Sequence, residues 1–311
     1  MIRILATVFA ALLGLAFGSF LNVCLSRWPE GESIVRPRSH CRHCDHALAW
    51  WENVPVLSWL ALRGRCRNCR ASIGCRYLLV EVSIAALWAG IMWHALPGCL
   101  GVDCFPPPDH AVSNICFLVL LDGGKVVLCW LLVALAVLDA EHLWLPDWLT
   151  LPGAALGFIT GALSLGLSWI WASPTPLVSR NGQIVDIRRQ MEASAFKWLL
   201  GIVAAAALML LIRWIYWLIR RREGVGLGDV KLMVLLAVWL GPYDTLLAFV
   251  LGVVLGALVA LVLLAIPRAR SNADDWALMK LPLGTFLCIG GIVSSLWGPH
   301  IIAAYLRWAG L

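Results

Sequence analysis

Long apolar segments recur along this chain, and they restrict its possible folds more than any other feature of the sequence. The segments from Ile4 to Leu25 and from Phe196 to Ile219 each reach the length of about 20 residues that a helix needs to cross a bilayer. Charged residues make up only 14% of the sequence, whereas a soluble domain carries about a quarter. Because a segment in lipid must satisfy its backbone hydrogen bonds internally, these segments predict an all-α polytopic membrane protein.

We expect about eight transmembrane helices. The segments that we interpret as spans cover approximately residues 4–25, 77–96, 126–138, 148–171, 196–219, 230–241, 245–266 and 281–306. A cleaved signal peptide, with Arg3 as its basic start, is the alternative interpretation of the first segment. We disfavour it because the apolar stretch continues past its small residues into GSFLNVCLSRWP, from Gly18 to Pro29.

Arginines concentrate in the polar region from Ser26 to Arg76, which contains nine of them and only four acidic residues. Since basic residues accumulate in the cytoplasmic loops of membrane proteins, this region is predicted to be cytoplasmic. The predicted domains are therefore a first transmembrane helix over residues 1–25, a cytoplasmic domain over 26–76 and a transmembrane domain over 77–311. The net charge of +6 does not indicate a nucleic-acid partner, because the basic residues lie in loops beside apolar segments.

Two CxxC motifs lie in this cytoplasmic region, with 21 residues between them. Their four cysteines are Cys41, Cys44, Cys66 and Cys69. Four thiolates at this spacing are typical of a tetrahedral zinc site, and disulfides are rare in the cytoplasm. A redox-active dithiol and free structural thiols are the alternatives, and three histidines could replace a cysteine as ligands: His40, His43 and His46. The simplest interpretation is a small cytoplasmic zinc-knuckle domain between the first two helices.

Two aspartates lie where predicted membrane helices meet the cytoplasm. Asp229 follows alternating glycines in GVGLGDVKL, residues 224–232, and directly precedes a predicted span. Asp139 ends another span in LDAEHLWLPDWLT, residues 138–150. Charged groups at such positions are costly and usually functional. Two carboxylates held close together share one proton, which provides a general base and a general acid for aspartic-protease chemistry.

The residues alone leave several interpretations of these acids open. The first motif holds Asp139, Glu141 and Asp147, and the sequence does not decide which of them faces Asp229. Each aspartate could instead cap a helix on its own, since Asp is a common N-cap residue. A proton relay in a transporter explains intramembrane acids as well as a protease does.

The ordered set of motifs resembles the bacterial type IV prepilin leader peptidase/N-methyltransferase family, which are Gly-x-Gly-Asp intramembrane aspartyl proteases. The similarity extends over nearly the whole chain. Its motifs are GSFLNVCLSRWP (18–29), the two CxxC pairs with LRGRCRNC (62–69), RYLLVE (76–81), LDAEHLWLPDWLTLP (138–152), GVGLGDVKL (224–232), VWLG (238–241) and LPLGTFLCIGG (281–291). Any one motif is weak, whereas the ordered set is highly specific.

The resemblance implies a peptidase that cleaves the basic leader of prepilins or pseudopilins after a glycine, at the cytoplasmic membrane face. It implies that Asp139 and Asp229 are catalytic, which favours Asp139 over Asp147 as the partner of Asp229. The residues expected to support the site are Gly226, Gly228, Lys231 and Asp147. The four cysteines correspond to the structural zinc ligands of the family's cytoplasmic domain.

Many members of that family also methylate the new N-terminal residue with S-adenosylmethionine, so the same activity is expected here. The methyl-donor site cannot be placed from these residues. The expected location is the bacterial inner membrane, with several passes and the active site facing the cytoplasm. The expected partners are prepilin or pseudopilin substrates, membrane lipid and the pilus or type II secretion machinery.

A few positions depart from the family's pattern. Leu78 stands where the family often has proline, and Leu227 and Val230 stand where it usually has an aromatic residue and Phe. None of these changes removes a catalytic carboxylate, so we expect them to bear on substrate preference.

A proton-coupled transporter that uses the same acids and a non-enzymatic assembly scaffold are the alternative functions. In a predicted outer loop, Cys99 and Cys104 are either free or paired.

Overall fold

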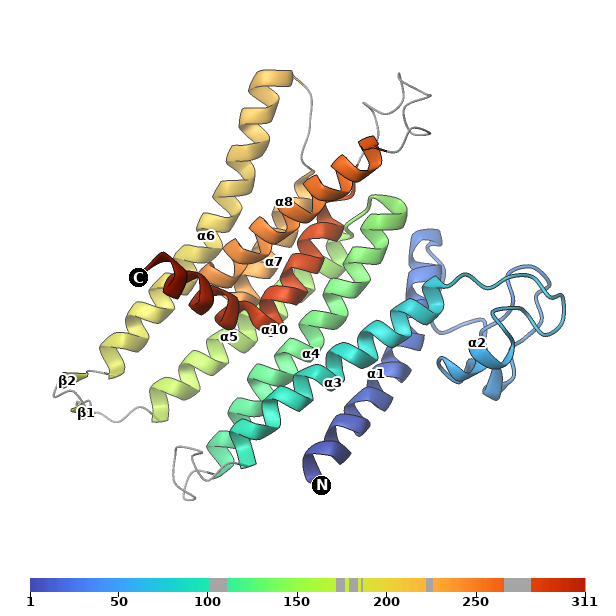
Figure 1. Cartoon of the computed structure of the whole chain (residues 1–311), viewed down its shortest axis with the longest axis horizontal. Coiled ribbons are helices and arrows are strands. Elements are labelled where there is room, and N and C mark those ends of the chain that lie inside the picture. The colour runs from blue at the N-terminus through green and yellow to red at the C-terminus, as the bar shows by residue number, and fades with distance from the viewer. Residues whose placement is uncertain are drawn as a thin grey trace. The chain divides into compact units, whose positions relative to one another are not determined.

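The computed structural model describes residues 1–100, 111–171, 177–178, 184–185, 187–221, 226–265 and 281–310. The described secondary structure is almost entirely helical, as the apolar segments predict, with one small β-ribbon (Figure 1). The chain divides into two compact units, Met1–Val137 and Leu138–Leu311, each with its own internal packing. The division predicted at residues 25 and 76 follows membrane topology rather than compactness, and it stays a prediction. Cys104 lies outside the described residues.

Two long helices pack at close range in the first unit. Its elements are α1 (Ile2–Arg27), η1 (Trp28–Glu30), η2 (Trp50–Asn53), α2 (Leu57–Ala61), α3 (Arg76–Leu100) and the larger part of α4 (Ala111–His142). Helices α1 and α3 lie side by side (Figure 1). A Cβ atom on Gly14 or Gly18 would lie 2.7 Å from the Cα atom of Ala85 or Glu81, respectively. Glycines four residues apart therefore let the two backbones approach without an intervening side chain.

A central helix organises the second unit, which contains the end of α4. Its other elements are α5 (Asp147–Trp171), β1 (Leu177–Val178), β2 (Ile184–Val185), α6 (Ile187–Arg220), α7 (Leu227–Leu240), α8 (Pro242–Ala265) and α10 (Leu283–Ala309). Strands β1 and β2 pair antiparallel. Helix α7 packs against α5, α6, α8 and α10. Leu232, Leu235 and Leu236 of α7 are completely buried, as expected for a helix that is apolar on all sides.

Hydrogen bonds from two tryptophans hold α7 to its neighbours. The indole N–H of Trp239 donates to the carbonyl of Gly153 in α5 at 2.9 Å. The indole N–H of Trp198 in α6 donates to the carbonyl of Val238 in α7 at 3.0 Å. Tryptophans in membrane proteins are usually expected at the lipid–water boundary. These two instead fix the packing of α7.

Seven described helices are long and apolar enough to cross a membrane, and they lie in α1, α3, α4, α5, α6, α8 and α10. They support a multi-pass membrane protein. Helix α7, which corresponds to the span predicted from Val230, has 14 residues, fewer than the ~20 that a full crossing needs. Its neighbours enclose it, so its apolar surface meets protein rather than lipid.

Candidate active site and metal centre

Asp139 lies in the last turn of α4 and is 6% exposed. Its Oδ2 atom accepts hydrogen bonds from the backbone N–H of Thr285 at 2.6 Å and from the Thr285 hydroxyl at 3.1 Å. Thr285 belongs to the first turn of α10, where unpaired N–H groups favour a negative charge. Two donors at a helix N-terminus therefore hold the Asp139 carboxylate in place.

Gly284 leaves room for this carboxylate. A Cβ atom at position 284 would lie 2.9 Å from Asp139 Oδ2 and 3.0 Å from Leu145 Cδ1, closer than side chains tolerate without movement. The sequence pattern drew attention to LPLGTF as a motif but assigned no role to Gly284 or Thr285. The sequence feature that could have indicated their role is this pair of small residues at the start of an apolar helix.

The second carboxylate, Asp229, lies in the first turn of α7 and is half-buried. Its Oδ2 atom accepts a hydrogen bond from the backbone N–H of Gly226 at 3.1 Å. Burial raises the pKa of Asp229 to about 6, the hydrogen bond from Gly226 opposes the shift, and the charge of Asp139 adds to it. Asp229 therefore keeps its proton at mildly acidic pH, where an ordinary aspartate is ionised.

Leu145 links the two carboxylate-bearing segments. It lies in the turn between α4 and α5, in contact with the Gly284 position of α10. A Cβ atom on Gly228 of α7 would lie 3.1 Å from Leu145 Cβ. The C-terminal end of α4 thus meets the N-terminal ends of α7 and α10 around one leucine. This convergence brings Asp139 and Asp229 within electrostatic range of each other.

The other two acids of the first motif do not share this setting. Asp147 begins α5 and forms an ion pair with Lys231 of α7, with 2.5 Å between Oδ1 and Nζ. The Asp147 side chain is 60% exposed. The Glu141 carboxylate lies 3.9 Å from His142 and is 37% exposed. Asp139 is therefore the buried acid of its motif, and Asp147 with Lys231 connects α5 to α7 beside the carboxylate pair. Gly224 lies outside the described residues.

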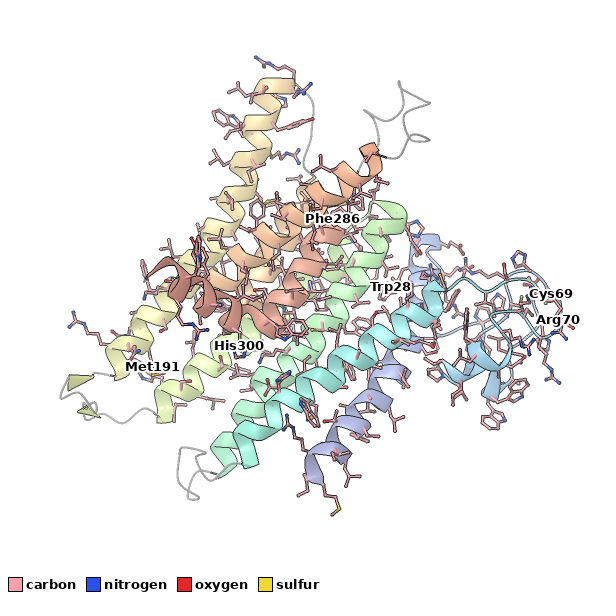
Figure 2. The ribbon with its side chains drawn as sticks, in the orientation of Figure 1. Trp28, Cys69, Arg70, Met191, Phe286 and His300 are labelled. Atoms are coloured by element: carbon pink, nitrogen blue, oxygen red, sulfur yellow. The ribbon has the colours of Figure 1, made fainter. Side chains whose placement is uncertain are left out.

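The four cysteines predicted as metal ligands form one cluster in the first unit. All four sulfur atoms lie within 4.8 Å of one another. Zn–S bonds of about 2.3 Å in a tetrahedron place sulfurs roughly 3.8 Å apart, and the sulfurs of Cys41 and Cys69 are 3.8 Å apart. Figure 2 shows Cys69 beside Arg70 in the segment around α2. The histidines that were alternative ligands are not part of this cluster.

The two CxxC loops have matching backbone geometry. In the first loop, the N–H of Cys41 donates to the carbonyl of His46, and in the second the N–H of Cys66 donates to the carbonyl of Ala71. An isolated antiparallel bridge closes each loop, between His40 and Ala47 and between Arg65 and Ser72. Each CxxC pair thus belongs to a knuckle that presents two sulfurs to one point.

Backbone N–H groups stabilise negative charge on part of this cluster. A hydrogen bond from the backbone of His46 lowers the pKa of Cys44. Backbone hydrogen bonds from Cys69 and Asn68 outweigh desolvation and lower the pKa of Cys66 to about 6. Thiolates are the form of cysteine that binds zinc. Burial and hydrogen bonds with the neighbouring thiols instead raise the pKa of Cys69 to about 11. The geometry of the four sulfurs and the lowered pKa values of Cys44 and Cys66 fit a metal such as zinc.

Two protein families match this chain over most of its length. The Bacterial Peptidase A24 N-terminal domain matches residues 12–95, which include all four clustered cysteines. The Type IV leader peptidase family matches residues 126–179 and 185–261, which include Asp139 and Asp229. The two matches follow the same order as the motifs in the sequence.

Individual relatives resemble the chain from end to end. A prepilin leader peptidase/N-methyltransferase of Stutzerimonas stutzeri is 33% identical over 99% of this chain and 96% of the relative. A protein of the same description from Burkholderia pseudomallei is 34% identical over 93% of this chain and 85% of the relative. A type 4 prepilin-like proteins leader peptide-processing enzyme of Escherichia coli is 31% identical over 92% of each chain. No solved structure matches significantly.

Proposed function

Because this chain belongs to the Type IV leader peptidase family, we propose that it removes the leader peptide of prepilins with Asp139 and Asp229 as its catalytic pair. The observation that carries the proposal is the convergence of these two carboxylates, one buried and one half-buried, at the ends of α4 and α7. The transporter alternative is not supported, since the relatives are peptidases over nearly the full length of the chain.

The two carboxylates have different surroundings, and this difference assigns their roles. Asp139 accepts two hydrogen bonds from Thr285 at a helix N-terminus, which favours its ionised form. Burial raises the pKa of Asp229 to about 6 against one hydrogen bond, from Gly226, so we assign the proton of the pair to Asp229. Asp139 then takes a proton from water, which attacks the scissile carbonyl. Asp229 donates its proton to the carbonyl oxygen. Asp139 then passes the proton from water to the leaving nitrogen, the C–N bond breaks, and Asp229 regains a proton from the tetrahedral intermediate.

The supporting residues shape the access to this pair. The glycines at 226 and 228 leave the backbone before Asp229 without side chains, so an extended substrate backbone can approach closely. The ion pair of Asp147 with Lys231 holds the starts of α5 and α7 together. The substrate's basic leader stays in the cytoplasm in this scheme, because the arginine-rich segment marks that side of the inner membrane.

We assign the chain a second reaction, methylation of the new N-terminal amine, which the description of its relatives supports. The methyl donor is S-adenosylmethionine, which supplies an electrophilic methyl group on a sulfonium. The methyl group moves to the nitrogen, the amine loses a proton and the sulfonium becomes a thioether. Zinc on the four cysteines is structural in this scheme, because four protein ligands leave no open position for substrate. The pilus or type II secretion machinery uses the product.

The test of the peptidase is a cleavage assay with the full-length protein in lipid nanodiscs and a prepilin that carries its leader. Asp139→Asn and Asp229→Asn are each expected to slow cleavage by at least about 100-fold, since each removes one member of an acid–base pair. Product mass gives the cleavage position and any added methyl group.

The matched control is Asp244→Asn. Asp244 also lies in the first turn of a helix, α8, and accepts a hydrogen bond from Ser294, but it is not part of the carboxylate pair. Asp244→Asn is expected to cleave at close to the wild-type rate. If Asp139→Asn or Asp229→Asn cleaves prepilin at close to the wild-type rate, the catalytic assignment is wrong.

A further inference from the structure

The backbone at Leu143, directly after α4, has an unusual conformation. Its φ of +50° lies in the left-handed region, which a leucine adopts at a steric cost and a glycine adopts freely. The N–H of Leu143 donates to the carbonyl of Asp139 at 2.9 Å. Leu143 therefore ends α4 at a position where helices commonly carry glycine.

Core packing does not explain a leucine at this position, because Leu143 is 51% exposed. A smaller residue would cost the hydrophobic core little, and glycine would also relieve the backbone. Strained backbone conformations occur preferentially at functional sites, where the surrounding structure maintains them. The combination of strain and exposure therefore points to a functional role for the Leu143 side chain.

The turn that begins at Leu143 leads to the carboxylate pair. Leu145, two residues later, lies between two glycine positions: a Cβ atom on Gly228 would be 3.1 Å from its Cβ atom, and one on Gly284 would be 3.0 Å from its Cδ1 atom. Gly228 directly precedes the second carboxylate, and Gly284 precedes the threonine that donates to Asp139. Leu143 therefore borders the site.

Two more exposed apolar residues border the same site. Leu227 begins α7, two residues before Asp229, and is 54% exposed. Trp148 lies in the first turn of α5 and is 47% exposed, and its ring contacts that of Trp144 with 6.4 Å between the centroids. Helices α5 and α7 pack together. Leu143, Trp148 and Leu227 are called the apolar rim below.

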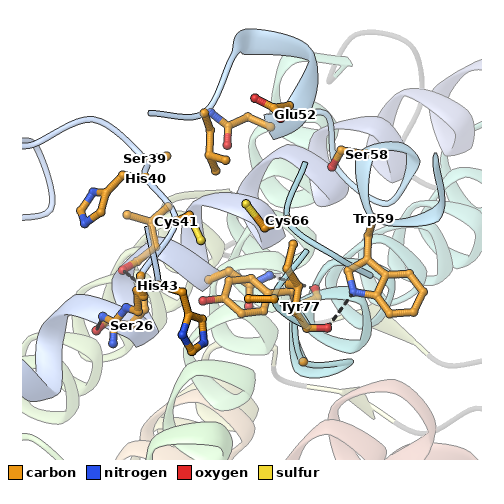
Figure 3. Close-up of a pocket in the computed structure, with 18 of the residues that line it drawn as sticks. Ser26, Ser39, His40, Cys41, His43, Glu52, Ser58, Trp59, Cys66 and Tyr77 are labelled. Carbon is orange, nitrogen blue, oxygen red and sulfur yellow. Dashed lines mark hydrogen bonds between the residues drawn. The ribbon is translucent and has the colours of Figure 1, made fainter. Parts of the chain in front are cut away.

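A cavity of about 590 Å³ lies in the first unit, beside the cysteine-bearing segment (Figure 3). Its wall carries two buried acceptors that have no partner among the described residues, Asn22 Oδ1 and Glu52 Oε1. Every wall residue lies between Ser19 and Glu81, whereas both carboxylates and the apolar rim belong to the second unit. This cavity therefore adds no side chain from the unit that holds the rim.

We propose that Leu143 is a specificity-determining residue, which binds, with the rest of the apolar rim, the apolar side chain that follows the scissile bond of the substrate. This inference rests on the proposed function and adds the recognition of one substrate side chain. Burial of exposed apolar surface favours binding of an apolar group.

The position of the carboxylates identifies the substrate side chain. Asp139 and Asp229 lie at the ends of helices in a membrane bundle, so the part of the substrate that stays in lipid begins beside the scissile bond. The residue after that bond remains with this apolar part, whereas the leader is released into water. The apolar rim is continuous with the catalytic pair and therefore meets the first residue on the lipid side.

Leu143→Gly separates the two properties of this residue, because it removes the side chain and relieves the backbone in one change. The thermal unfolding midpoint of the full-length protein in nanodiscs is expected to rise by about 2 °C. KM for prepilin is expected to rise about tenfold, with kcat unchanged, since a contact made equally in the ground state and the transition state is lost.

Leu143→Ala removes most of the same side chain but keeps the strained backbone. KM is expected to rise as in the glycine variant, whereas the unfolding midpoint is expected not to rise. A fall in kcat at unchanged KM in both variants would mean that Leu143 acts through the backbone of Asp139, and it would overturn the proposal.

The matched control is Arg221→Gly. Arg221 also follows the end of a helix, α6, with a φ of +54°, and its N–H donates to the carbonyl of Trp217 at 2.8 Å. It is exposed and lies outside the apolar rim. KM is expected to equal that of the wild type. A rise like that of Leu143→Gly would show that loosening a helix end is sufficient, which would overturn a specific contact.

A change in the substrate identifies the contact directly. Prepilin with alanine after the scissile bond is expected to have a KM about tenfold higher than unaltered prepilin with the wild-type enzyme. With Leu143→Gly the same change is expected to raise KM by less than about twofold, because the partner side chain is already absent. Equal effects in the two enzymes would show that these residues do not touch.

The wild-type assay distinguishes this inference from the proposed function. Wild-type cleavage, with KM unchanged in both Leu143 variants, would overturn the contact and leave the peptidase intact, and the rim would then face lipid. Absence of cleavage by the wild type would overturn the proposed function, and this inference with it.

Discussion

Thr285 holds the carboxylate that we assign as the general base, so it is a positioning residue for the reaction. Thr285→Val removes the hydroxyl donor and keeps the backbone N–H. Loss of one hydrogen bond to a charged group is worth about 1.5–3 kcal/mol, so kcat is expected to fall roughly 10- to 100-fold. KM for prepilin is expected to stay the same, because the hydroxyl donates to Asp139.

The rescue variant for this prediction is Thr285→Ser, which restores a hydroxyl at the same position. It is expected to return most of the lost kcat. A fall in KM and kcat together, or no recovery with Ser, would indicate that residue 285 acts through packing instead of through Asp139.

The pKa of Asp229 makes a pH dependence testable at the residue scale. Since this pKa is raised from 3.8 to about 6, the protonated acid is present below that pH and is lost above it. The cleavage rate is therefore expected to fall above about pH 6, by about tenfold per pH unit. Measurement of kcat between pH 5 and pH 8, a window that brackets the value of about 6, checks this.

Gly226 provides the variant for the pH experiment. Its backbone N–H stabilises the ionised form of Asp229, and its φ of −72° suits proline. Gly226→Pro removes that N–H, so the alkaline fall in rate is expected at higher pH than in wild type. Gly226→Ala keeps the N–H and serves as the control. If the pH dependence of kcat is unchanged in the proline variant, a group other than Asp229 causes the fall in rate at high pH.

At the scale of elements, the contact of α1 with α3 depends on two glycines that face the partner backbone. Gly14→Ala places a Cβ atom 2.7 Å from the Cα atom of Ala85, so the helices must separate. Overpacking of this kind costs about 1–3 kcal/mol. The thermal unfolding midpoint in detergent is expected to fall, as measured by the loss of helical circular dichroism.

Gly90 of α3 supplies the matched control, because a Cβ atom there has no neighbour within 4 Å. Gly90→Ala is expected to leave the midpoint unchanged or to raise it, since alanine favours helix more than glycine does. Equal midpoints for the two variants would contradict a close glycine-mediated contact.

At the scale of the whole molecule, the two compact units are expected to respond differently to loss of metal. The purified protein should contain close to one zinc per chain by elemental analysis, and Cys69→Ser should remove most of it. Chelation should then expose the segment around the cysteines to protease, because the four cysteines hold its two CxxC loops together. Residues 138–311 should stay resistant, since that unit has its own packing.

Ser72→Ala is a control for the cysteine change, because Ser72 lies in the same segment and contributes no ligand. It should keep both the zinc and the protease resistance. A wild-type protein without metal, or a protease pattern that chelation does not alter, would show that the cysteines serve another purpose.

The sequence alone predicted seven of the membrane helices, the cluster of four cysteines and the two aspartates that we propose as catalytic. Apolar segments of spanning length must become helices in lipid, whichever neighbours they acquire. The CxxC pairs bring their ligands together locally, because each pair lies within one short loop. The motif resemblance favoured Asp139 among three acids that local reasoning could not separate.

Only the tertiary structure decided what depends on contacts between distant segments. Thr285 lies 146 residues from Asp139, so no local pattern could show that it donates to this carboxylate. Other features also depend on contacts between distant segments. They are the enclosure of α7, the ion pair of Asp147 with Lys231, and the unpaired acceptors of Asn22 and Glu52. Local composition sets which segments form helices, whereas burial and hydrogen bonding between helices depend on how those helices pack.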